Sequence, residues 1–191
     1  MKNFFKQLYL NNFFFYCLMG IIFLFLLAFF FPMFYSASWY LLFVLLTFTV
    51  IDVILLFSSK NAVTGIRNTP EKLSNGDEND VTIYLQNKYS FPVWVKVIDE
   101  IPFQFQERNF EVKRKLKAQG KDNFNYYLRP TKRGEYFFGN LNVYVKSPLQ
   151  LVSRRFTYDN GKMVPTYPSF IQLRKYDLMA FSNNLFQYGL K

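Results

Sequence analysis

Residues 13–31 read FFFYCLMGIIFLFLLAFFF, and no charged side chain interrupts this apolar run. A second apolar run, residues 37–57, contains Asp52 as its one charged residue. Because an α-helix rises about 1.5 Å per residue, ~20 apolar residues cross the ~30 Å hydrocarbon core of a bilayer. A buried helix of a soluble protein would carry a polar face, which the first run lacks. The pattern predicts two transmembrane helices, joined at residues 32–38 into a hairpin, that form a membrane anchor over residues 1–58.

Both flanks of the predicted hairpin carry positive charge. Lys2 and Lys6 precede the first run. Lys60 and Arg67 follow the second run, and the connection between the runs has no Lys or Arg. Because basic flanks stay on the cytoplasmic side, we expect a multi-pass protein of a bacterial inner membrane with its soluble domain in the cytoplasm. A cleaved signal peptide is the rival interpretation, but its apolar core would be only ~7–15 residues long.

Asp52 lies in the last third of the second run. An ionisable residue at membrane depth is by default a candidate functional residue, for example in a proton relay. Neither apolar run contains a Lys, Arg or His that could act with it. We therefore favour an interfacial carboxylate that reaches lipid headgroups or water.

From residue 59 the hydrophobic pattern changes to a period of two, as in Val81, Ile83 and Leu85. Such alternation between turn-forming residues is typical of half-buried strands. The segments with this character are residues 63–67, 81–87, 93–98, 110–116, 124–128, 141–146, 154–158 and 162–166. Asp159-Asn-Gly161 predicts a hairpin between the last two segments. About seven or eight short strands over residues 59–170 predict an antiparallel, immunoglobulin-like β-sandwich. Residues 171–191 are expected to form a short helix or linker that leads to a missing C-terminal domain.

Composition excludes several kinds of active site. The 191 residues include no His and one Cys. A Ser-His-Asp triad, a Cys-His pair and a His-bearing zinc or haem site are therefore excluded, as is an internal disulfide. The sequence also lacks a Gly-rich phosphate loop and a Gly-x-Ser-x-Gly motif. We expect a protein that is not an enzyme and needs no cofactor.

The net charge of +10 lies mostly beyond the anchor, and its densest run is Lys113, Arg114, Lys115 and Lys117. A solvated edge strand protected by charge is the favoured interpretation. Contact with the anionic surface of the membrane is the second, because a tethered domain stays close to the lipid bilayer. A nucleic-acid patch is not expected, because no recognised nucleic-acid module accompanies the run.

Residues 133–151 read RGEYFFGNLNVYVKSPLQL. This segment resembles the membrane-anchored family known as domain of unknown function 58, whose pattern is an Arg-Gly-x-Tyr-x-Phe-Gly turn followed by a Ser-Pro-hydrophobic-Gly-Leu turn. Asp99-Glu100-x-Pro102 fits a further step of that pattern, whereas Gln150 stands where the family usually has Gly. The candidate residues of the motif are Arg133, Gly134, Tyr136, Phe138, Gly139, Ser147, Pro148, Tyr167 and Pro168. Aromatic residues at strand spacing usually fill a core, so we expect these residues to be structural, with a partner surface around Arg133 as the alternative.

The resemblance implies a function together with a MoxR-type AAA+ ATPase or related von Willebrand factor A-like proteins, in envelope maturation or stress. Members of the family continue into a von Willebrand factor A-like domain, whose opening signature this sequence lacks. We therefore expect a non-enzymatic, membrane-anchored scaffold. An extracytoplasmic β-sandwich that binds peptide or glycan is the alternative.

Overall fold

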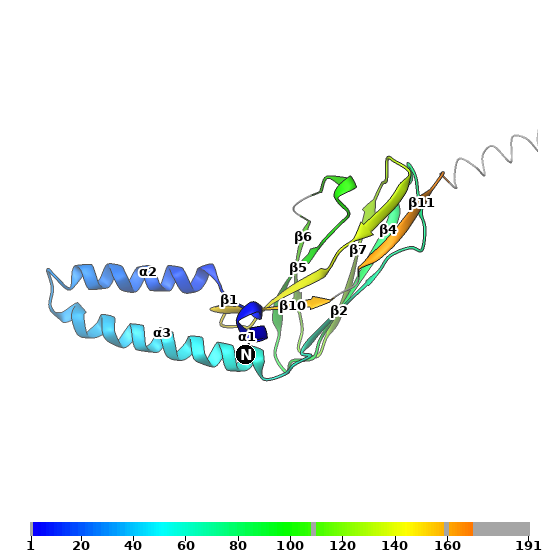
Figure 1. Ribbon diagram of the computed structural model, residues 1–191. Helices are drawn as coiled ribbons and strands as arrows, with labels where there is room; N and C mark the ends of the chain where they lie inside the picture. The colour runs from blue at the N-terminus through cyan, green and yellow to red at the C-terminus, as the bar shows by residue number, and fades with distance from the viewer. Residues whose placement is uncertain (1, 108–109, 159–160, 170–191) are drawn as a thin grey trace, which may run out of the picture.

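The computed structural model describes residues 2–107, 110–158 and 161–169. It consists of a helical hairpin that projects from one end of a β-sandwich (Figure 1). The helix or linker expected at residues 171–191 lies outside the described residues.

The hairpin consists of α2 (Asn12–Leu27) and α3 (Met33–Phe57), which pack side by side. The chain turns at residues 28–30, and α3 begins directly after Pro32. The prediction of a connection over residues 32–38 is therefore wrong. Proline suits the start of a helix because it has no N–H that needs a partner there.

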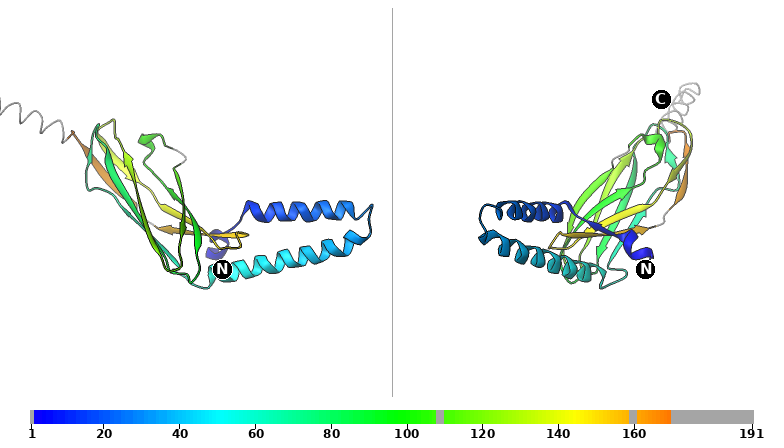
Figure 2. Two further views of the ribbon diagram at one scale, coloured as in Figure 1. Left: turned by 180° about the vertical axis from the view of Figure 1, so that it is seen from behind. Right: turned by 60° about the vertical axis from the view of Figure 1, so that its left-hand side comes forward.

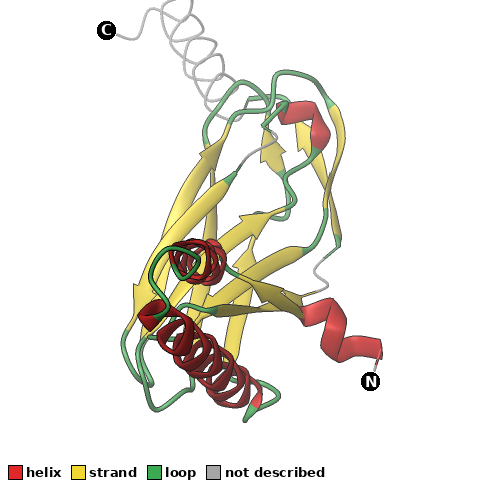
Figure 3. Cartoon of the chain, turned by 90° about the vertical axis from the view of Figure 1, so that its left-hand side faces the viewer, coloured by secondary structure: helices red, strands yellow, loops and turns green. Residues whose placement is uncertain are grey.

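Before the hairpin, α1 (Lys2–Gln7) leads into β1 (Leu8–Leu10). β1 pairs with a strand of the sandwich, Leu8 lying opposite Arg154. The chain thus contacts the soluble domain both before and after the hairpin, although residues 8–10 lie within the range predicted for the anchor. Figure 3 views the molecule from the hairpin end, with α2 and α3 in front of the strands.

Only α3 among the described helices meets the usual criteria for a membrane span. It has 25 residues and a mean hydropathy of 2.6. α2 is equally apolar in character but has 16 residues, fewer than the ~20 that cross a bilayer as a helix. The structure therefore supports one of the two predicted spanning helices by length and composition.

The β-sandwich prediction is confirmed. Ten strands lie within the described part of residues 63–167. They are β2 (Val63–Asn68), β3 (Leu73–Ser74), β4 (Asn79–Asn87), β5 (Val93–Asp99), β6 (Glu111–Leu116), β7 (Lys121–Leu128), β8 (Gly134–Phe138), β9 (Leu141–Lys146), β10 (Val152–Tyr158) and β11 (Lys162–Tyr167). A short 3-10 helix, η1 (Phe103–Phe105), lies between β5 and β6.

The strands form one five-stranded sheet and two three-stranded sheets. The strand orders are β1-β10-β9-β5-β6, β2-β4-β7 and β3-β11-β8. Figures 1 and 2 show β5 and β6 on the side of the sandwich nearer the helices, with β4 and β7 on the far side. Inward residues of the facing layers, such as Val81, Ile83, Val97 and Val143, are fully buried, as period-two alternation requires.

The predicted hairpin between residues 154–158 and 162–166 is wrong. β10 pairs with β9 on one edge and with β1 on the other. β1 covers only residues 152–154 of its edge. β11 pairs instead with β8 and, in parallel, with β3. The chain crosses from one sheet to another between β10 and β11, so a turn-forming sequence between two strands does not make them a hairpin.

A buried charged cluster joins the facing sheets. Asp99 of β5 pairs with Arg67 of β2 and accepts a hydrogen bond from the Tyr126 hydroxyl of β7 at 2.5 Å. Arg67 also donates from Nη2 to the carbonyl oxygen of Gly139 at 2.9 Å. Burial raises the pKa of Asp99, which Arg67 opposes, and burial also raises the pKa of Tyr126. Each charge is thus paired and hydrogen-bonded, which is the condition under which buried charges are tolerated.

Removal of Asp99 is expected to be strongly destabilising. Asp99→Ala leaves the Arg67 charge buried without its carboxylate, which costs about 3–5 kcal/mol of unfolding free energy. Urea unfolding of the full-length protein in detergent measures this loss. Glu111→Ala is the control, because Glu111 forms its ion pairs at the surface, where such pairs contribute little. Equal losses for the two variants would contradict the assignment.

Candidate functional site

The aromatic residues of the Arg-Gly-x-Tyr-x-Phe-Gly motif lie in the core. Tyr136 and Phe138 are buried in β8, whereas Phe137 between them is 55% exposed. The Phe138 ring lies 5.2 Å from the Arg67 guanidinium carbon. The Tyr136 hydroxyl donates to the carbonyl oxygen of Lys132 at 2.9 Å.

The two glycines of the motif are required at their positions for different reasons. Gly134 has a φ of +137°, a conformation that residues with a Cβ rarely adopt. A Cβ on Gly139 would lie 2.5 Å from Oε2 of Glu100. Glu100 is held there because it accepts hydrogen bonds from the Asn140 N–H at 2.8 Å and from the Asn142 side chain at 2.9 Å. Gly139 therefore allows the β5 end to pack against the start of β9. Arg133 is exposed before β8.

The Ser-Pro turn lies between the helices and the sandwich. Ser147 is buried, and its Oγ accepts a hydrogen bond from the Leu149 N–H at 3.0 Å. Gln150 has a φ of +57°, in the left-handed region that glycine adopts at least cost. Leu149 and Leu151 line an apolar hollow together with residues of α2 and α3. The turn at residues 147–151 is thus inserted against the base of the hairpin. Pro148 in this turn is exposed.

Asp52 binds this turn directly. Its side chain is fully buried, and Oδ2 accepts hydrogen bonds from the N–H groups of Leu151 at 3.0 Å and Val152 at 2.9 Å. The expectation that this carboxylate reaches headgroups or water is therefore wrong. The tertiary fold brings the start of β10 to α3, where Oδ2 accepts both N–H bonds, whereas the buried Oδ1 has no hydrogen-bond partner among the described residues.

Arg154 and Tyr89 bind the C-terminal end of the same helix, about one turn beyond Asp52. Nη1 of Arg154 donates to the carbonyl oxygens of Leu56 at 2.8 Å and Ser59 at 2.6 Å. The Tyr89 hydroxyl donates to the Leu56 carbonyl oxygen at 2.5 Å. A helix C-terminus leaves carbonyl groups without partners and carries partial negative charge, so an arginine is favourable there. The guanidinium also lies 4.5 Å from the Phe57 ring.

We call Asp52, Tyr89, Arg154 and the turn at residues 147–151 the junction. It connects α3 to β9 and β10 and to the segment before β5. Burial raises the pKa of Tyr89, against the opposing effect of Arg154, so the hydroxyl stays a donor at neutral pH. The junction holds the hairpin and the sandwich in one orientation.

Tyr167 and Pro168 lie at the end of β11 and directly after it, and are not among the residues of the junction. Tyr167 ends β11, is 43% exposed, and has the Lys72 ammonium 5.1 Å from its ring. Pro168 is half-buried. These two residues end the described part of the sandwich and do not join the other motif residues in one site.

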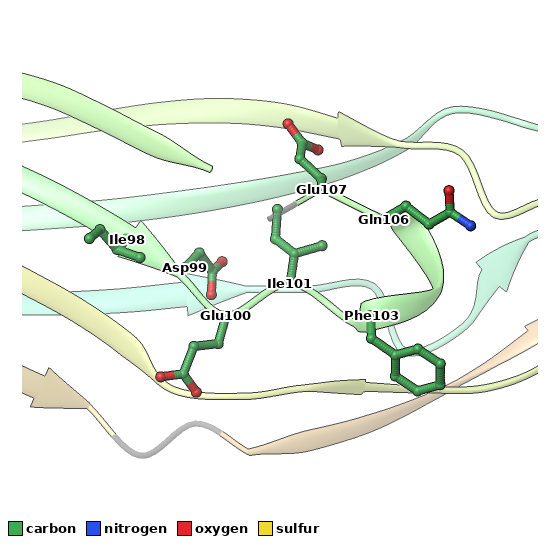
Figure 4. A pocket seen from close by; sticks show the side chains of 7 residues that line it. All are labelled: Ile98, Asp99, Glu100, Ile101, Phe103, Gln106 and Glu107. Carbon is green, nitrogen blue, oxygen red and sulfur yellow. The ribbon is translucent and has the colours of Figure 1, made fainter. Parts of the chain in front are cut away.

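A hollow of ≈ 880 Å³ lies after β5. Figure 4 shows that the residues lining it come from one continuous stretch, with the Glu100 and Glu107 side chains directed away from each other. The Asp99 carboxylate is engaged by Arg67 and Tyr126. The hollow thus offers no pair of carboxylates for acid–base chemistry. Within the described residues, no three His, Cys, Asp or Glu side chains gather as a metal site.

The basic run lies on β6, the last strand of the five-stranded sheet, and just after it. Lys113 pairs with Glu111 at 2.9 Å, and Arg114 approaches Asp122 at 3.9 Å. Lys115 lies 4.7 Å from the Trp94 ring. Lys117 is exposed beyond the strand. This placement matches a charged edge strand, with Lys113 and Lys115 also on the outer face of the sheet.

Arg154 and Lys146 were not identified by sequence reasoning. The sequence pattern does single out Arg154, because this residue stands between Val152 and Phe156 on a face of β10 that is otherwise apolar. A cation on an inward face of a strand indicates a buried partner. Nothing in the local sequence identifies that partner as the end of a helix almost a hundred residues earlier.

Comparison with known proteins gives a likeness of fold only. No protein-family model matches the sequence, and no curated protein matches it. Among solved structures, a PapD-like domain of human CEP192 is 13% identical, with 56% of this chain and 87% of that chain covered and a TM-score of 0.41. The CARDB domain of a Pyrococcus furiosus protein is 13% identical over 55% of this chain and 87% of its own, with a TM-score of 0.36. The C-terminal domain of wzt is 10% identical over 58% and 77%, with a TM-score of 0.39.

Loss of the Asp52 carboxylate is expected to loosen the junction. Asp52→Leu leaves two buried N–H groups without an acceptor, which costs about 2 kcal/mol. The amides of Leu151 and Val152 should then exchange hydrogen about 30-fold faster, as measured on the full-length protein in micelles. Thr49→Val is the matched control, because the Thr49 hydroxyl bonds to the Leu45 carbonyl within the same helix. Unchanged exchange in Asp52→Leu would contradict the pairing.

Replacement of Gln150 by glycine is expected to stabilise the protein. Gln150→Gly removes about 1–2 kcal/mol of left-handed strain, partly offset by the greater freedom of glycine in the unfolded chain. Gln86→Gly in β4 is the control and should destabilise, because Gln86 is not among the residues with positive φ. Thermal unfolding of both variants should therefore shift in opposite directions, and shifts of the same sign would contradict the conformation.

Proposed function

We propose that this protein is a membrane-anchored scaffold whose two helices insert in a bacterial inner membrane and whose β-sandwich presents an interaction surface on the cytoplasmic side. The observation that carries the proposal is the junction. A flexible tether would let the domain rotate freely, whereas the hydrogen bonds of Asp52 and Arg154 fix the sandwich relative to the helices. A fixed orientation is useful to a protein that presents one face to a partner.

The exposed apolar side chains of α2 and α3 support the insertion of both helices in a membrane. Large apolar side chains point outward around both helices, among them Phe23 at 59%, Phe43 at 72% and Ile54 at 62%. Exposed apolar surface on this scale marks contact with a membrane or a partner. α2 lies along α3, and Phe29 and Phe30 continue its apolar surface as far as the turn. If α3 spans the bilayer, α2 is held in it as well.

The proposed protein partner is a MoxR-type AAA+ ATPase or a related von Willebrand factor A-like protein. Support for this partner comes from the resemblance of residues 133–151 to the domain of unknown function 58 family. The motif residues themselves build the sandwich, because Tyr136 and Phe138 are buried. A partner would therefore contact the exposed surface that the motif supports, including Arg133.

Membrane sidedness is the first test of this proposal. Protease added to spheroplasts should leave residues 60–169 intact, and protease added to inverted membrane vesicles should digest them. Carbonate extraction should leave the protein in the membrane fraction. Digestion in spheroplasts would contradict the cytoplasmic placement and favour the extracytoplasmic peptide- or glycan-binding module instead.

A further inference from the structure

Lysines cluster on the outer face of the five-stranded sheet. Lys96 of β5 lies opposite Lys113 of β6, and Lys146 of β9 lies opposite Trp94 of β5. Because alternate residues of a strand share a face, these side chains stand together on the sheet. We call Lys96, Lys113 and Lys146 the lysine cluster.

The lysine cluster carries more positive charge than its neighbours neutralise. Glu111 accepts from Lys96 Nζ at 3.1 Å and from Lys113 Nζ at 2.9 Å. Within the described part of the chain, Lys146 has no ion-pair partner. Burial lowers the pKa of Lys146, and the nearby charges of Lys96 and Lys113 lower it further. Two ammonium groups therefore share one carboxylate beside a third that has no ion pair, and an added anion would reduce their repulsion.

The lysine cluster lies beside the start of the first membrane helix. It lines a hollow of ≈ 350 Å³ together with residues 11–13 and Gln150. α2 begins at Asn12, so the hollow also faces a helix N-terminus, where free N–H groups and the helix dipole favour negative charge. Figure 2 shows this sheet on the side of the sandwich that faces the hairpin.

A second hollow continues into the hairpin. It has a volume of ≈ 520 Å³ and is lined by apolar side chains of α2 and α3. Phe13 lines both hollows. Leu149 and Leu151 border the apolar hollow, and Gln150 between them lines the basic one. A cationic hollow at the predicted membrane surface thus adjoins an apolar groove within the predicted membrane.

We propose that these two hollows bind one anionic phospholipid. The headgroup phosphate lies against the lysine cluster, and one acyl chain lies in the groove between α2 and α3. A phospholipid fits this pair of hollows because its phosphate and acyl chain are covalently joined across the membrane interface. The proposal rests on the membrane insertion stated above and adds a specific ligand to it.

The test compares lipids with identical acyl chains. Full-length protein in detergent is titrated with phosphatidylglycerol or phosphatidylcholine, and bound lipid is measured by native mass spectrometry. Each lysine near an anionic surface contributes about a fivefold gain in binding. Wild-type protein should therefore prefer phosphatidylglycerol by about tenfold or more, and the variant Lys96→Gln/Lys113→Gln/Lys146→Gln should lose this preference.

A matched variant controls for net charge. Lys72→Gln/Lys132→Gln/Arg133→Gln removes three exposed positive charges away from the cluster and should keep the preference. Circular dichroism of each variant checks that the sandwich is folded. Preference retained by the cluster variant, or lost equally in both variants, would overturn the headgroup site.

A third variant tests the acyl chain. Gly20 lines the apolar groove, and a Cβ there would meet no atom within 4 Å. Gly20→Leu should fill the groove and weaken phosphatidylglycerol binding about tenfold, while leaving the lysine cluster intact. Unchanged affinity in Gly20→Leu would overturn the groove assignment. Complete displacement of the lipid by millimolar inorganic phosphate would show a soluble-anion site and overturn the lipid proposal.

The outcomes separate this proposal from the proposed function. Sidedness and carbonate extraction are measured on native membranes without reference to lipid type. A protein that inserts as proposed but binds both lipids equally would refute the phospholipid site alone.

Discussion

Asp52 sets how the two parts of this protein are joined. Its carboxylate accepts the N–H groups of Leu151 and Val152, which stand at the start of β10. These groups lie where the turn at residues 147–151 leads into β10. A buried N–H without an acceptor costs as much as a lost hydrogen bond. The position of the turn against α3 therefore depends on this side chain, together with Arg154 and Tyr89 at the end of the same helix.

Arg154 also joins the sandwich to the hairpin, but here the side chain comes from the sheet and the backbone groups come from the helix end. Asp52 brings a negative charge from the helix to the sheet, and Arg154 brings a positive charge from the sheet to the helix end. Arg154 binds carbonyl oxygens, including those of Leu56 and Ser59. The two charges act on backbone groups of the opposite element. Arg154 donates to carbonyl groups and Oδ2 of Asp52 accepts N–H groups, in contrast to the direct ion pair between Arg67 and Asp99. The sandwich is thus held against the hairpin by charged groups that the hydrophobic pattern alone would not place in the interior.

The sequence patterns predicted the positions of the strands better than they predicted which strands pair with each other. Period-two alternation located β4, β5, β7 and β9 correctly, because each strand buries one face against the opposite layer. Partner choice is a property of the whole sheet, and the error at β10 and β11 shows why. The turn-forming residues between them allow either a hairpin or a crossing between sheets. β1, three residues that precede the helical hairpin, pairs with the first residues of β10, a partner that no local pattern indicates.

The sequence by itself determined an apolar helical hairpin, a β-sandwich and the absence of His-based chemistry, because composition and periodicity are local properties. The family pattern that the sequence resembles has glycine at positions 139 and 150. In the structure, Gly139 lies close to Glu100, and Gln150 has a left-handed backbone conformation. Only the tertiary structure decided that Asp52 faces the sandwich, that Arg154 caps a helix, and that Lys96, Lys113 and Lys146 gather beside α2. The contacts of Asp52 with the sandwich and of Arg154 with residues 56–60 join residues 94 to 100 positions apart. They depend on desolvated charges and backbone groups that meet only after both parts have folded.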